Sequence, residues 1–105
     1  MSKKVYNKLV RDKIPEIIRA DGKEPKFRYL QKAEYLEELI KKLGEEYEEF
    51  KVDQNKEELA DLQEVILALA EALNISPGDL AKAVSKKALE RGAFKKRLFL
   101  ESVDD

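Results

Sequence analysis

The stretch EEYEEFKVDQNKEELADLQEV, residues 45–65, joins two amphipathic segments. The segment that leads into it, about 32–52, places apolar residues three and four positions apart, which is typical of a helix with one buried face. Residues 53–55 then supply the turn, and a second helical pattern covers about 56–73. The stretch therefore predicts an antiparallel helical hairpin. The row facing the hairpin core has a glutamate where an apolar residue is expected: Leu36, Leu39, Leu43, Glu46 and Phe50.

The helix expected over 56–73 carries two neighbouring rows of residues. One row is apolar throughout, whereas the other is acidic at its start and apolar further on. From Val65 to Ala70 the helix is apolar on all sides, which indicates burial against more than one neighbour. Three helices of this size cannot cover it, so we expect a homodimer or homotetramer. The two rows are Leu59, Leu62, Ile66, Leu69 and Leu73, and Glu58, Asp61, Val65, Ala68 and Ala72.

A third helix is predicted over about 77–91. Ser76 is a natural N-cap, Pro77 suits the first helical position, and Gly92 ends the helix. A short link from the second helix sends this helix back along the hairpin. Its row changes from apolar to basic along the helix: Leu80, Val84, Lys87 and Arg91.

The segments at both ends carry weaker patterns. Asp12 is expected to cap a short helix over about 15–19, which Gly22 ends. Residues 26–30 alternate in polarity, which predicts an extended segment or a minor strand. The tail, 93–105, is expected to pack at least in part through Phe94, Leu98, Phe99 and Leu100.

The composition favours one helical domain over residues 1–105. Leu, Ala, Glu and Lys dominate, and there are only four glycines and three prolines. The predicted fold class is all-α, with an antiparallel helical hairpin, a third helix and a four-helix-bundle core completed by oligomerisation.

The composition also excludes several kinds of chemistry. The chain has no cysteine and no histidine, which removes thiolate sites, Ser-His and Cys-His catalysis and most zinc sites. A metal would have to be a hard cation bound by oxygen, such as Mg²⁺ or Mn²⁺. A net charge of −1 predicts no binding of a nucleic acid polymer or an anionic membrane. Without a visible signal peptide or spanning segment, a cytoplasmic protein is expected.

Four carboxylates are expected to meet near the turn of the hairpin. Folding the chain at 53–55 brings Glu49 opposite Glu58, and Glu46 opposite Asp61 one turn deeper. Within each helix the two acids are three residues apart and share a face. Crowded, partly desolvated carboxylates repel each other, and a divalent cation relieves that repulsion. The alternative is that these glutamates form an ordinary solvated helix face, as we expect for Glu45, Glu48 and Glu57; Glu64 is ambiguous.

Basic residues are predicted to complement this acidic cluster. If the third helix returns along the hairpin, Lys87 and Arg91 arrive beside the carboxylates, which suits a polyphosphate substrate. The alternative for both residues is a stabilising interaction with the helix dipole. Lys8 and Arg11 lie in a basic N-terminal segment that could cover a phosphate or be a surface arm. A base could stack on Tyr6, Phe27, Tyr47 or Phe94.

Four strings resemble the MazG-like all-α nucleotide pyrophosphatases, in particular a branch called phosphoribosyl-ATP pyrophosphohydrolase-like. They are EEYEEF (45–50), EELADLQEV (57–65), YNKLVRDKIPEII (6–18) and KALERGAF (87–94). The resemblance implies Mg²⁺ ligands at Glu46, Glu49, Glu58 and Asp61, cleavage between the α and β phosphates, and a four-helix core built by dimerisation. The chain departs from the family because only eight residues separate Glu49 from Glu58. This shortened hairpin could remove a ligand or alter the substrate pocket.

The expected function is hydrolysis of a nucleoside triphosphate or a related nucleotide to a monophosphate and pyrophosphate. The carboxylates would hold one or two Mg²⁺ ions that bridge phosphate oxygens and lower the pKa of a water. Glu49 is a candidate proton acceptor, and Lys87 and Arg91 would stabilise phosphate charge. The alternative is a non-catalytic helical oligomerisation or regulatory module that kept the fold. A membrane-surface helix is poorly supported, because acids and bases mix on every polar face.

Overall fold

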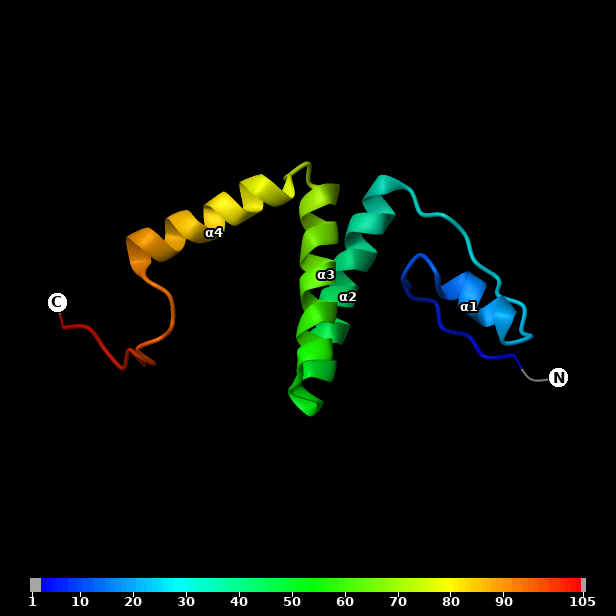
Figure 1. Ribbon diagram of the computed structural model, residues 1–105, viewed down its shortest axis with the longest axis horizontal. Coiled ribbons are helices and arrows are strands. Elements are labelled where there is room, and N and C mark those ends of the chain that lie inside the picture. The colour runs from blue at the N-terminus through cyan, green and yellow to red at the C-terminus, as the bar shows by residue number, and fades with distance from the viewer. Residues whose placement is uncertain (1–2, 105) are drawn as a thin grey trace.

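The computed structural model describes residues 3–104 and contains four helices and no strand within them. They are α1 (Ile14–Ala20), α2 (Lys32–Val52), α3 (Lys56–Ala72) and α4 (Pro77–Arg91) (Figure 1). The all-α fold class and the hairpin are confirmed. Residues 26–30 belong to an irregular segment instead of a strand. Within residues 3–104, no helix combines the length and the apolar character needed to cross a membrane.

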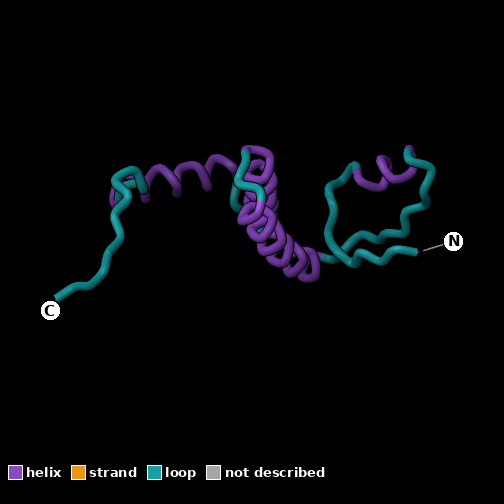
Figure 2. Tube along the Cα trace, turned by 90° about the horizontal axis from the view of Figure 1, so that it is seen from below, coloured by secondary structure: helices purple, strands orange, loops and turns teal. Residues whose placement is uncertain are grey.

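The helices α2 and α3 form the hairpin and hold the core of the chain. They run side by side over their length, as both views show (Figures 1 and 2). Among the described residues, Leu39 on α2 and Val65 and Ala70 on α3 are the buried apolar ones, and Glu46 on α2 is buried as well. The partly acidic row of α3 therefore faces α2. The apolar row is only partly covered, with Leu59, Ile66 and Leu73 exposed and Leu62 and Leu69 half-buried.

Local capping residues set the start of two helices. The Asn55 side chain accepts a hydrogen bond from the backbone N–H of Glu58 at 2.9 Å, and Ser76 Oγ accepts one from the N–H of Asp79 at 3.1 Å. Each such cap contributes about 1 kcal/mol to stability. Gly92 follows α4 with a φ of 84°, a left-handed conformation that glycine adopts without strain. Asp12 caps nothing, because α1 begins after Lys13 and has no side-chain cap.

The helix α4 and the tail do not return along the hairpin. Figures 1 and 2 show α4 leaving the top of α3 and pointing away from the hairpin. None of its residues is buried, and it makes no contact with α2. The tail is also exposed, with Phe94 at 96% and Phe99 at 87% of their full area. The expected return of α4 and packing of the tail are therefore wrong within one chain. The four residues of the link, with Asn74 at a φ of 60°, direct α4 outward.

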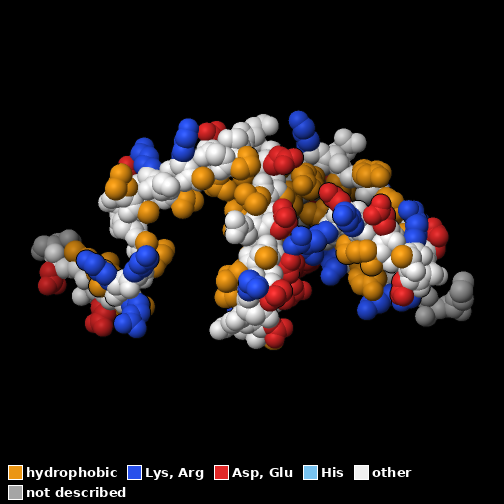
Figure 3. All heavy atoms as spheres, viewed as in Figure 1, with side chains coloured by type: hydrophobic (Ala, Val, Ile, Leu, Met, Phe, Trp, Pro, Cys, Tyr) orange, Lys and Arg blue, Asp and Glu red, His pale blue; other side chains and the backbone are white. Residues whose placement is uncertain are grey.

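The chain is far more extended than its mass requires. Its radius of gyration is 18.5 Å, whereas a compact chain of this length has one of about 13 Å. Its accessible surface is 10201 Å², against about 6,000 Å² for a compact monomer of 12.1 kDa. Many large hydrophobic side chains are exposed, and Figure 3 shows them along α4 and beside the hairpin. Exposed apolar surface of this extent is typical of sites that contact another molecule, and the oligomer stays a prediction.

We predict that the protein is at least a dimer at micromolar concentration. Contacts through the apolar row of α3 should hold the copies together. Light scattering should give a mass well above 12.1 kDa. Ile66→Asp should bring the mass down to that of one chain, because it places a charge in an apolar contact. Ile17→Asp, at an exposed position on α1, should leave the mass unchanged. A wild-type mass of one chain would refute the oligomer.

Candidate metal centre

The turn of the hairpin brings the four predicted carboxylates together. Glu46 and Glu49 come from the last turns of α2, and Glu58 and Asp61 come from the first turns of α3. One carboxylate oxygen from each lies within 4.8 Å of those of the other three. The Asn55 cap fixes the first turn of α3, from which Glu58 projects. The shortened hairpin therefore does not remove any of the four from the cluster.

Two oxygens of this cluster are buried without a partner. Glu46 is only 6% exposed, although it is charged. Its Oε1 lies 3.5 Å from Lys42 Nζ, but its Oε2 has no hydrogen-bond partner, and neither does the buried Oε2 of Glu58. A buried polar atom without a partner is costly, and each such atom in a native structure requires an explanation. A cation bound between the two helices would satisfy both oxygens.

The electrostatics of the cluster disfavour four simultaneous negative charges. Burial raises the pKa of Glu46, the neighbouring Glu49 raises it further, and Lys42 opposes the change. Partial desolvation also raises the pKa of Glu58, and the charges of Glu49 and Asp61 add to that effect. A divalent cation would reverse both shifts by favouring the ionised carboxylates.

The raised pKa of Glu46 predicts how metal-free stability depends on pH. A folded-state pKa above the ordinary value of 4.5 means that the folded chain holds this proton more tightly than the unfolded chain. Glu46 therefore destabilises the fold increasingly as pH rises from about 4.5 to its folded pKa, and by a constant amount above that. Thermal melts with a chelator should show the wild type losing stability relative to Glu46→Gln across this window. A difference that is independent of pH would contradict the shift.

One predicted basic residue, Arg11, lies at the cluster. Its Nη2 donates a hydrogen bond to Asp61 Oδ1 at 2.5 Å, and its Nη1 lies 4.0 Å from Glu64 Oε1. Lys8 instead lies over the ring of Tyr6, at 5.9 Å from its centroid. The sequence prediction missed Lys42, whose spacing of four residues before Glu46 is the signal that would have found it.

The other two predicted basic residues, Lys87 and Arg91, do not reach the carboxylates of their own chain. Both are exposed on α4, which points away from the hairpin and does not contact α2. The expectation that the chain path delivers them beside the acidic cluster is therefore wrong for a single chain. The cause is the outward direction of α4, which contacts only α3 among the four helices.

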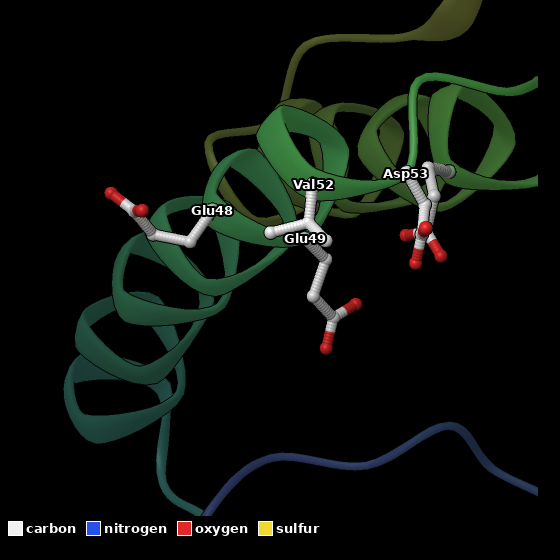
Figure 4. A pocket seen from close by; sticks show the side chains of 5 residues that line it. Glu48, Glu49, Val52 and Asp53 are labelled. Carbon is white, nitrogen blue, oxygen red and sulfur yellow. The ribbon is translucent and has the colours of Figure 1, made fainter.

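A surface hollow of about 550 Å³ lies beside the carboxylates at the turn. It is lined by Glu48, Glu49, Val52, Asp53 and Glu58. Figure 4 shows the Glu49 carboxylate pointing to the side along which the N-terminal segment passes, whereas Glu48 points away from it. The hollow leaves Glu49 and Glu58 accessible from solvent.

No protein-family model matches the chain, and neither a curated protein nor a solved structure is significantly similar to it.

Proposed function

We propose that this chain is a Mg²⁺-dependent nucleotide pyrophosphohydrolase. Its substrate would be a nucleoside triphosphate or a related nucleotide, cleaved between the α and β phosphates to a monophosphate and pyrophosphate. The observation that carries the proposal is the pair of buried, unpartnered oxygens on Glu46 and Glu58, inside a set of four converging carboxylates. Hard oxygen donors suit Mg²⁺, or Mn²⁺, and phosphate oxygens usually complete the coordination of Mg²⁺.

The four carboxylates would have different roles according to how deeply each is buried. Glu46 and Asp61 lie deeper in the hairpin and would hold the metal, together with Glu49 and Glu58 near the hollow. A bound Mg²⁺ would neutralise phosphate charge and make a water molecule more acidic. Glu49 is the most exposed of the four and points to the side of the N-terminal segment. It would accept a proton from that water.

The phosphate-binding cations would come from two sources. Arg11 already lies at the cluster of its own chain. Lys87 and Arg91 would reach the cluster of a second copy, since α4 extends away from its own hairpin with no residue buried. The site would then be complete only in the oligomer. The exposed residues in the apolar row of α3 support the proposal that an oligomer forms.

The test is pyrophosphate release from a panel of nucleoside triphosphates and related nucleotides, with Mg²⁺ or with a chelator. Thermal melts with and without millimolar Mg²⁺, in the absence of nucleotide, give a second readout, because a bound metal stabilises the folded state. Metal-dependent release by the wild type supports the enzyme. The alternative, a non-catalytic helical module, is supported if no nucleotide is cleaved and Mg²⁺ leaves the melting temperature unchanged.

A further inference from the structure

One arginine connects the start of the chain to the candidate metal centre. We define residues 3–13 as the N-terminal arm. Arg11 on this arm bonds Asp61, fifty residues further along the chain, and lies near Glu64. Among the described residues before α2, only Arg28 forms another ion pair with the hairpin, and its partner Glu34 is near in sequence. The short helix α1 contacts no other helix. Arg11 is therefore the principal polar anchor of the arm.

The carboxylate that holds Arg11 is also a proposed metal ligand. Its Oδ1 accepts a hydrogen bond from the guanidinium at 2.5 Å, a charge-assisted contact. A divalent cation bound to the same carboxylate would lie close to the guanidinium, and the two positive charges would repel each other. We propose that Arg11 and the metal ion compete for Asp61, so that metal binding releases the arm and arm docking weakens metal binding. This inference rests on the proposed function, because it requires the metal.

The exposure of the two ion pairs indicates whether the metal would displace Arg11 or Lys42. The Arg11 and Asp61 side chains are 55% and 36% exposed, so water can take over the guanidinium's hydrogen bonds. Lys42 is different, because it is 19% exposed and lies on the same helix as its partner Glu46. Lys42 therefore stays when the metal enters, whereas Arg11 leaves.

Release of Arg11 has a consequence for substrate binding. The arm carries Lys4 and Lys8, both within 6 Å of the centre of the Tyr6 ring, as well as Arg11. Figure 3 shows basic and acidic side chains meeting where the N-terminal segment approaches the hairpin. Once Arg11 leaves Asp61, its guanidinium is free to pair with a phosphate bound at the metal. The arm would then be docked on Asp61 without metal, released with metal alone, and docked again through the phosphates of a bound nucleotide.

The experiment measures metal affinity without nucleotide on the full chain. Mn²⁺ is the probe, and its free concentration is read from its paramagnetic resonance signal. Arg11→Gln should tighten Mn²⁺ binding by up to about fivefold, because the free energy of an exposed ion pair corresponds to a factor of at most about five in affinity. The matched control is Arg19→Gln on α1. It removes a cation that lies over the ring of Phe27, and it should leave the affinity for Mn²⁺ unchanged. Weaker or unchanged binding in Arg11→Gln would overturn the competition.

Motion of the arm provides a reciprocal readout. Because the coupling is mutual, metal should loosen the arm by the same factor by which the arm weakens metal. The ¹⁵N heteronuclear relaxation of residues 4–13 should report greater motion when Mg²⁺ is added to the wild type. In Arg11→Gln the arm should be equally mobile with and without Mg²⁺. An arm that Mg²⁺ leaves unchanged or rigidifies in the wild type would contradict the inference.

The outcomes separate this inference from the proposed function. If the wild type binds Mn²⁺ and Glu46→Gln loses it, the metal centre stands, and the result for Arg11→Gln alone decides the competition. If the wild type binds no Mn²⁺ at millimolar concentration and cleaves no nucleotide, the proposed function and the competition both fall.

Discussion

Replacing Glu46 with glutamine should reduce pyrophosphate release at least about a hundredfold and leave the fold intact. Loss of an outer hydrogen-bond partner of a metal ligand already costs about 10–100-fold in affinity or activity. Loss of the ligand itself should cost no less. The change keeps the side-chain volume, and the buried site loses one of its repelling charges, so metal-free stability should hold or rise. Asp61→Asn should behave in the same way, because it also removes one charge from the cluster.

Two measurements separate loss of the site from loss of the fold. Steady-state kinetics and thermal melts on the same preparations should show lost turnover, an unchanged or higher melting temperature in chelator, and no stabilisation by Mg²⁺. The matched control is Glu37→Gln, which changes an exposed glutamate of α2 that lies nine residues before Glu46 and does not line the hollow. It should keep both activity and stabilisation by Mg²⁺. Wild-type turnover in both Glu46→Gln and Asp61→Asn would place the active site elsewhere.

The parts of the fold that the sequence predicted correctly are those that local periodicity determines. The spacing of apolar residues located α2 and α3 to within one residue, and it placed Glu46 in the buried row. The convergence of the four carboxylates followed from the position of the turn alone. Ser76 and Gly92 marked both ends of α4, because capping requires only the neighbouring backbone.

The features that the sequence did not reveal are those that helical periodicity does not determine. The pairing of Arg11 with Asp61 joins residues fifty positions apart, and no periodic pattern links them. The direction of α4 follows from a short link with Asn74 in a left-handed conformation, which the expected return along the hairpin did not anticipate. Phe94 and Leu98 are exposed, so the predicted packing of the tail is wrong within one chain. An apolar side chain favours burial, but the sequence does not indicate which surface would cover it.

The largest remaining effect is expected for Arg91→Met, which should lower kcat/KM by about a hundredfold. A cation that strengthens its contact with phosphate in the transition state contributes about 2–4 kcal/mol to catalysis. A charge that only complements the helix dipole contributes about 0.3–1 kcal/mol to stability and leaves catalysis nearly unchanged. Lys87→Met should follow Arg91→Met in kinetics. A lowered melting temperature with unchanged kcat/KM would assign both residues to the helix dipole alone.

Mixing two inactive variants would show which chain supplies the cation. If Arg91 acts on the site of a second copy, a dimer of one Glu46→Gln chain and one Arg91→Met chain has one site with both defects and one intact site. Random exchange at equal concentrations in a symmetric dimer should then restore about a quarter of wild-type activity. If Arg91 acted within its own chain, each site of the mixed dimer would carry one defect and no activity would return. The outward path of α4, which leaves Arg91 exposed and away from its own carboxylates, is the reason to expect recovery.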